Sequence, residues 1–107
     1  MKKALPIVYS GFYDAPLAFL VKYSNRVYLF WRGYFNDEID DYSPEYEVFI
    51  TKLSSIENIN VDWENLWKQG IDSNFVGKIH INNVIFDSTH RKFIGVDTFK
   101  ELFNKTN

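Results

Sequence analysis

The sequence predicts an α+β domain in which an antiparallel β-sheet carries most of the residues and two short helices complete the fold. Short runs rich in β-branched and aromatic residues fill the first half of the chain, and turn residues separate most of them. Helical spacing of apolar residues occurs only in two short segments of the second half. The predicted order is β-β-β-β-α-β-β-α, and a sheet of this kind can curl toward a small barrel.

Four strands are predicted in the first half, at residues 7–12, 17–23, 27–35 and 46–53. Ser24-Asn25 has the length and composition of a two-residue hairpin turn between the second and third strands, because Asn tolerates a positive φ. The third run is apolar on both faces and therefore predicts a central strand, in which Gly33 marks a bend or bulge.

A short helix is predicted to follow the fourth strand. Asp62 is a suitable N-cap, Gly70 is a suitable C-terminal stop, and Trp63, Leu66 and Trp67 share one face. This spacing predicts that the helix lies on the sheet with its tryptophans in the core rather than at a ligand site.

The last part of the chain returns to strand character and ends in a second helix. Residues 76–86 predict a hairpin that turns at Asn82-Asn83, and residues 93–96 predict a further short strand. Thr98 and Glu101 have the spacing of a capping box that opens the final helix.

Length and composition indicate a single globular domain. The 107 residues of the chain are enough for one hydrophobic core and too few for two, so residues 1–107 are expected to fold as one unit. Aromatic residues reach 19%. However, Phe, Tyr, Ile, Asn and Lys supply 46 of the 107 residues, a bias that an AT-rich genome produces. The aromatic excess is therefore weak evidence of function, and a low-GC bacterium or its phage is the expected source.

The most unusual stretch of the sequence is residues 36–47, which read NDEIDDYSPEYE. It holds six carboxylates and no basic residue, so a net charge of −2 divides into −6 inside the stretch and +4 outside it. One interpretation is a solvated loop whose charges protect a neighbouring strand edge from aggregation. The other is a docking surface in which carboxylates steer association and tyrosines supply contact area. The expected partner-binding residues are Asp37, Glu38, Asp40, Asp41, Tyr42, Glu45 and Tyr46.

The docking interpretation predicts a non-enzymatic protein-binding module. Its partner would be a protein with a basic surface, such as a nuclease or a defence protein, and the chain would act as an immunity-type or anti-defence inhibitor. Small, cysteine-free proteins that are acidic in one region and lack catalytic motifs have the profile of nuclease inhibitors. Whether the chain is a monomer or a homodimer stays open, because an edge strand can pair two subunits.

The alternative is a small metal-independent phosphodiesterase or RNase-like enzyme. In that case His80 and His90 would act as general base and general acid, and Arg91 would hold the phosphate. No motif enforces this geometry, so ordinary surface histidines are the competing interpretation. Asp87-Ser88-Thr89-His90-Arg91 also has the composition of a polar turn.

Other function classes find little support in the sequence. There is no cysteine, the five glycines are too scattered for a phosphate-binding loop, and the acidic stretch lacks the spacing of an EF-hand calcium loop. No cofactor or metal is therefore expected. The scattered basic residues argue against direct nucleic-acid binding, and the absence of a long apolar run argues against a membrane span. The expected location is the cytoplasm.

Three segments resemble a family of small bacterial or phage domains of unknown function. They are the Tyr-Asp-x-Pro-Leu-x-Phe element within residues 12–19, the pair Tyr28-Leu29 in a strand, and the helix end at residues 66–70. The likeness covers about the first two thirds of the chain. Asp14 and Pro16 also have a local explanation, since Asp can close an Asx-turn and Pro can fix the entry to a strand. The resemblance implies no activity.

Overall fold

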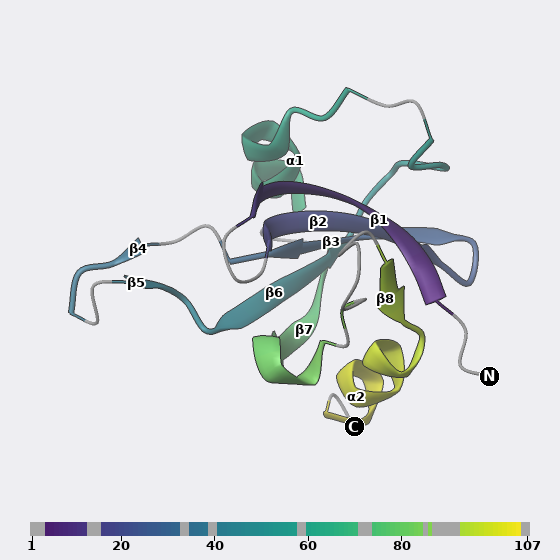
Figure 1. Cartoon of the computed structure of the whole chain (residues 1–107). Coiled ribbons are helices and arrows are strands. Elements are labelled where there is room, and N and C mark those ends of the chain that lie inside the picture. The colour runs from purple at the N-terminus through teal and green to yellow at the C-terminus, as the bar shows by residue number, and fades with distance from the viewer. Residues whose placement is uncertain are drawn as a thin grey trace.

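The computed structural model describes residues 4–12, 16–32, 35–38, 41–57, 60–70, 74–84, 86 and 93–105. Within these ranges the chain forms a mostly antiparallel β structure with two short helices (Figure 1). The elements are β1 (Ala4–Phe12), β2 (Pro16–Tyr23), β3 (Arg26–Trp31), β4 (Phe35–Asn36), β5 (Asp41–Tyr42), β6 (Glu45–Ile50), α1 (Trp63–Gly70), β7 (Phe75–His80), the 3-10 turn η1 (Ile81–Asn83), β8 (Phe93–Gly95) and α2 (Asp97–Lys105). No helix in the described ranges is long and apolar enough to cross a membrane.

Six of these strands form one sheet in the order β7-β6-β3-β2-β1-β8, with every neighbouring pair antiparallel. β3 occupies the interior of the sheet, as its apolar residues on both faces predict. In the described residues β7 and β8 are the two ends of the order, so the sheet is open and does not close into a barrel.

The turn between β2 and β3 confirms the sequence prediction. Ser24 and Asn25 have φ angles of 53° and 65°, and Tyr23 pairs with Arg26 across them. Positive φ at both central residues gives the turn a twist that matches the strands it joins. This turn fixes the register of the whole β2–β3 pair, and hence which side chains face each side of the sheet.

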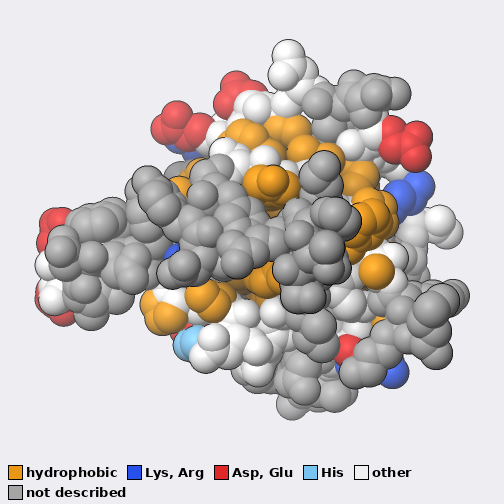
Figure 2. All heavy atoms as spheres, in the orientation of Figure 1, with side chains coloured by type: hydrophobic (Ala, Val, Ile, Leu, Met, Phe, Trp, Pro, Cys, Tyr) orange, Lys and Arg blue, Asp and Glu red, His pale blue; other side chains and the backbone are white. Residues whose placement is uncertain are grey.

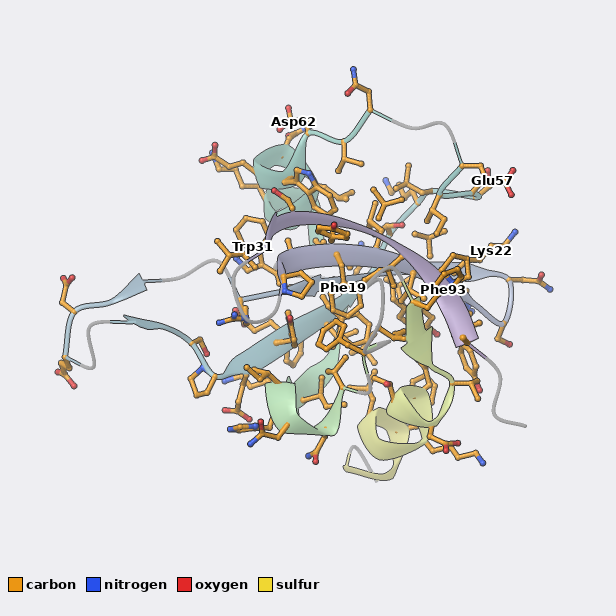
Figure 3. All side chains as sticks on the ribbon, viewed as in Figure 1. Phe19, Lys22, Trp31, Glu57, Asp62 and Phe93 are labelled. Atoms are coloured by element: carbon orange, nitrogen blue, oxygen red, sulfur yellow. The ribbon has the colours of Figure 1, made fainter. Side chains whose placement is uncertain are left out.

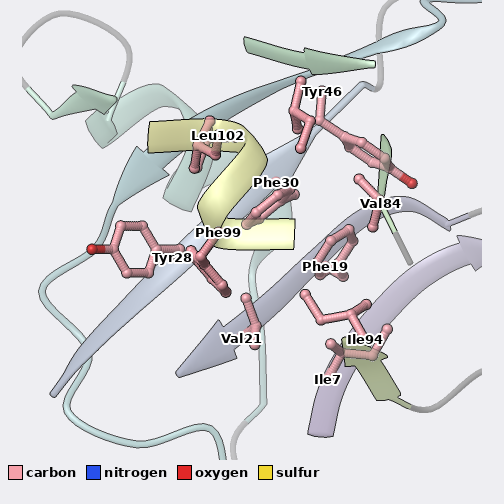
Figure 4. Close-up of a cluster of buried hydrophobic side chains, with 12 residues drawn as sticks. Ile7, Phe19, Val21, Tyr28, Phe30, Tyr46, Val84, Ile94, Phe99 and Leu102 are labelled. Atoms are coloured by element: carbon pink, nitrogen blue, oxygen red, sulfur yellow. The ribbon is translucent and has the colours of Figure 1, made fainter. Parts of the chain in front are cut away.

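One side of the sheet, here called the α2 face, holds the larger core (Figure 4). Aromatic rings dominate its centre. Phe19 and Phe30 stack with centroids 4.5 Å apart, and Phe99 of α2 stacks on Tyr23 at 4.1 Å. The buried residues of this core are Ile7, Phe19, Val21, Tyr28, Phe30, Tyr46, Val48, Ile79, Val84, Ile94, Phe99 and Leu102.

The opposite side, here called the α1 face, is covered by α1 and the chain that leads into it. Trp63 and Leu66 pack on the buried residues of this face, which confirms that this side of the helix faces the core. The predicted N-cap is also confirmed, because the Asn65 N–H donates to Asp62 Oδ1 at 3.2 Å. The buried residues are Ala18, Leu20, Val27, Leu29, Phe49 and Ile56.

The predicted hairpin at residues 76–86 is wrong. β7 pairs with β6, and among the residues described after η1 Phe86 forms a bridge with Ile94 of β8. The physical reason is the core of the α2 face, because Val84 is buried there and the ring of Phe86 lies 5.7 Å from that of Phe19. These apolar side chains pack on the α2 face, and the described pairing of this segment is with β8 rather than with β7.

Two smaller predictions also need correction. Between β3 and β6 along the chain, where an unpaired loop was expected, β4 and β5 form a short two-stranded sheet of their own. The final helix begins at Asp97, one residue before the predicted N-cap Thr98, which is fully buried. The predicted bend at Gly33 lies outside the described residues.

Candidate functional site

The acidic stretch forms a projecting hairpin, here called the acidic arm and defined as residues 35–42. Its described parts are β4 and β5, in which Phe35 pairs with Tyr42 and Asn36 pairs with Asp41. Figure 1 shows this hairpin extending away from the sheet, beyond the ends of β3 and β6. The arm therefore continues two interior strands of the sheet rather than lying along either of its edges.

Two carboxylates of the arm, those of Asp37 and Glu38, lie in the turn that follows β4. Asp37 and Glu38 are exposed, and Figure 2 shows acidic side chains at the end of the projection. Asp40 lies outside the described residues, and only the backbone of Asp41 and Tyr42 is described. The described acidic positions thus belong to a turn and to the strand that returns from it.

Two further carboxylates of the acidic stretch belong to the sheet instead of the arm. In β6, Glu45 pairs in register with His80 and Glu47 pairs with Lys78. Glu47 and Lys78 carry opposite charges, and directly opposed side chains on one face lie close enough for such charges to attract. The stretch therefore divides into an arm with four carboxylates and a strand whose two carboxylates have basic cross-strand partners.

Tyr46, one of the predicted partner-binding residues, has its side chain in the core of the α2 face. Its side chain is fully buried, and its ring lies edge-on to Phe19 and Phe30 at 5.2 and 5.9 Å between centroids. Its hydroxyl donates to the carbonyl oxygen of Pro16 at 2.6 Å. Burial raises the pKa of Tyr46 to about 12, although the nearby Arg32 opposes this shift. The residue is thus a neutral core group at the root of the arm.

A buried arginine holds the base of the arm to the sheet. Arg32 is only 7% exposed, and its backbone N–H donates to the Leu17 carbonyl at 2.8 Å. Its Nε donates to the Pro16 carbonyl at 3.2 Å, and its Nη1 donates to the Ser43 carbonyl at 3.3 Å. The guanidinium also lies 5.8 Å from the centroid of the Tyr46 ring, within cation–π distance. Arg32 thus joins the start of β2 to the returning strand of the arm.

The returning strand has its own local hydrogen bonds. Ser43 Oγ accepts from the Glu45 N–H at 3.2 Å, and the Pro44 carbonyl accepts from the Ile81 N–H at 2.9 Å. These bonds fix the direction in which the chain enters β6. With Arg32 they give the arm a defined base, so the arrangement presents negative charge on a projection whose root is held in place.

Sequence reasoning missed the role of Arg32. The available signal was a single charged residue inside the apolar run 27–35, in the segment VYLFWRGYF. A charge in such a run is buried only with hydrogen-bond partners, so its presence marks a place where backbone carbonyls converge.

The residues of the enzyme alternative are only partly described. His80 is the last residue of β7, and its Nδ1 accepts from the Asn82 N–H at 3.1 Å, so its imidazole caps the η1 turn. His90 and Arg91 lie outside the described residues. Their position relative to His80 therefore stays a prediction, and no described contact assigns a catalytic role to His80.

A scan against protein-family models finds no matching family, and searches of curated proteins and of solved structures find no match. The resemblance to small bacterial domains of unknown function stays a prediction. The acidic arm, with its exposed Asp37 and Glu38, is therefore the feature of the described residues that suggests a function.

Proposed function

We propose that this chain is a non-enzymatic protein-binding module that acts in the cytoplasm and docks its acidic arm on a basic surface of another protein. The partner class that fits is a nuclease or another defence protein, which would make the chain an immunity-type or anti-defence inhibitor. The observation that carries the proposal is the concentration of carboxylates on a hairpin that projects from the sheet and is held at its base by Arg32.

The position of the charge favours docking over simple solvation. A solvated loop that protects a strand edge would lie beside β7 or β8, which end the sheet, whereas the arm extends the interior strands β3 and β6. Charge on a projection also reaches a partner before the rest of the surface does. Such charge raises the rate of diffusional encounter by about 10- to 1000-fold in steered complexes.

The fixed base favours binding as well. An arm whose root is already ordered loses less conformational entropy when it docks, so more of the interaction energy appears as affinity. Arg32, Tyr46 and Ser43 supply this order through contacts inside the protein. None of the three side chains has to leave its place for the arm to reach a partner.

A pull-down from the native host lysate tests the proposal. The baits are the unchanged protein, the double variant Asp37→Asn with Glu38→Gln, and a control that removes the same charge elsewhere, Glu57→Gln with Glu64→Gln. Glu57 and Glu64 are exposed residues outside the arm. We expect one dominant partner that binds the unchanged protein and the control, is lost from the arm variant, and is released at high salt.

The contrary outcome is equally clear. If all three baits retain the same proteins, or if the dominant partner stays bound at high salt, the acidic arm is not the docking surface.

A further inference from the structure

A hollow of about 600 Å³ lies on the α1 face, at the opposite end of the sheet order from β7. The floor comes from β1 and β2, and one wall comes from the chain between β6 and α1. Its volume is within the range of small-molecule sites, about 300–1000 Å³. The lining residues are Pro6, Ile7, Val8, Lys22, Ser55, Ile56 and Glu57.

The floor of this hollow is an apolar row with one cation in it. On β2, Ala18 and Leu20 belong to the core of the α1 face, and the alternation of the strand puts Lys22 on that same face. Lys22 pairs with Val27 of β3 on one side. On its other side, the β1–β2 register that pairs Ile7 with Val21 places Pro6 beside Lys22.

The apolar row continues to the edge of the sheet. Pro6 pairs with Phe93 of β8, and Phe93 is 37% exposed. Figure 3 shows Lys22, Phe93 and Glu57 at the same end of the sheet. In Figure 2 one basic and one acidic side chain lie beside hydrophobic side chains at this end. Lys22 thus rises from an otherwise apolar floor.

The two charged residues of the hollow differ in where they are held. Lys22 is on β2, a strand that is paired on both sides. Glu57 is on the irregular segment that forms the wall, where its own backbone N–H donates to Ser55 Oγ at 3.1 Å. The ion pairs found within the described residues join Lys68 to Glu64 and Lys100 to Asp97, so they include neither Lys22 nor Glu57.

We propose that the hollow binds a small amphipathic carboxylate. The apolar part of the ligand lies against Val8 and Ile56, and its carboxylate pairs with the Lys22 ammonium. The charge preference follows from the floor: a molecule that covers it also removes water from Lys22, and a cation that loses water needs a negative partner. A cationic ligand would cover the Lys22 ammonium without giving it a negative partner. This site is independent of the acidic arm.

Titration with decanoate, followed by amide chemical shifts, tests this proposal. We expect saturable shifts at Ile7, Val8, Lys22 and Ile56, and weaker binding of decyltrimethylammonium, which has the same chain length and the opposite charge. Equal binding of the two probes, or shifts centred away from these residues, would overturn the proposal.

Three single variants show whether the charges of the hollow decide affinity. Lys22→Gln is expected to weaken decanoate binding by about tenfold, because it removes a charge-assisted hydrogen bond. Glu57→Gln is expected to tighten it by about threefold, because it removes a nearby like charge at an exposed site. Lys78→Gln removes the same charge as Lys22→Gln at the other end of the sheet and should leave binding unchanged.

Because Lys22 is exposed, its substitution should not impair folding, and the thermal unfolding curve of each variant verifies this. If Lys22→Gln folds normally and binds decanoate as tightly as the unchanged protein, the hollow is not a carboxylate site.

Discussion

Arg32 lies buried at the base of the acidic arm, where the carbonyl oxygens of Pro16 and Ser43 accept its hydrogen bonds. A buried cation is costly unless such partners compensate for the water it has lost. The Pro16 carbonyl also accepts the hydroxyl of Tyr46, so one backbone oxygen of β2 receives two donors from the two strands that lead to and from the arm. The orientation of the arm depends on these few contacts.

Arg32→Met tests this role. It keeps most of the apolar stem but leaves the Ser43 carbonyl without the guanidinium, so we expect a loss of about 1–3 kcal/mol in the free energy of unfolding. We also expect faster hydrogen exchange in the arm than in β2 and β3. Urea unfolding and hydrogen exchange measure the two effects. Arg26→Met, at an exposed position of β3, is the matched control. Unchanged arm exchange would mean that Arg32 does not hold the arm.

Tyr46 predicts a dependence of stability on alkaline pH. Its pKa is raised from 10.0 to about 12 in the folded protein, so the folded state holds the phenol proton more tightly than the unfolded state does. The resulting stabilisation is present below pH 10 and is lost as the pH rises toward 12, on the order of 2 kcal/mol in total.

Urea unfolding across this alkaline range, compared with Tyr46→Phe, measures the effect. The variant removes the titrating group and keeps the ring, so its free energy of unfolding should fall less steeply with pH. The comparison isolates Tyr46 because the raised pKa of Tyr28 contributes equally to both proteins. Parallel slopes would show that Tyr46 does not titrate in the folded state as described.

The sequence identified several single residues correctly because local chemistry decides them. The Asp62 cap and the Asn25 turn each follow from a hydrogen bond or a φ preference of the residue itself. Two patterns of the sequence overlap at Tyr46. Composition groups it with the carboxylates of residues 36–47, whereas strand alternation groups it with Val48, and burial follows the alternation.

At the scale of elements, the acidic arm and the two cores are separate. The described parts of β4 and β5 pair with each other in a sheet of their own, and the described side chains of the arm, Asp37 and Glu38, are exposed. Removal of the arm should therefore leave the six-stranded sheet intact, because β4 and β5 pair with each other outside that sheet.

Replacement of residues 35–42 by an Asn-Gly turn tests this separation. We expect the shortened protein to keep its β-sheet circular dichroism and to change its free energy of unfolding by less than about 1 kcal/mol, since a shorter loop also costs less entropy to close. It should also lose binding to the partner that the full protein captures. Unfolding of the shortened protein would show that the arm is a structural element of the domain.

Elements that depend on long-range packing were harder to predict. The segment 84–86 is as apolar as a strand, and local pattern alone assigns it to a hairpin. In the structure Val84 and Phe86 pack on the α2 face. They do so because Phe19 and other core residues, which are far away in the sequence, offer them an apolar surface. β3 was predictable because its position inside the sheet requires apolar residues on both faces, and the sequence displays them directly.

At the scale of the whole molecule, the sheet separates two surfaces of different chemistry. The acidic arm extends from the β3–β6 pair, and the apolar hollow with Lys22 lies at the β1–β2 end. The net charge of the whole chain is only −2, whereas residues 35–42 of the arm alone carry −4, so the negative field is concentrated near the arm. Such polarisation orients an approaching partner before contact.

The measurement that tests the docking claim most directly is the association rate with the captured partner, over a range of salt concentrations. The series compares the unchanged protein, the double variant at Asp37 and Glu38, and a fourfold variant that also carries Asp40→Asn and Asp41→Asn. We predict that the rate falls stepwise, by about tenfold for the fourfold variant, and that its salt dependence flattens, while Glu57→Gln with Glu64→Gln changes neither. Equal rates and equal salt dependence for all proteins would contradict the account.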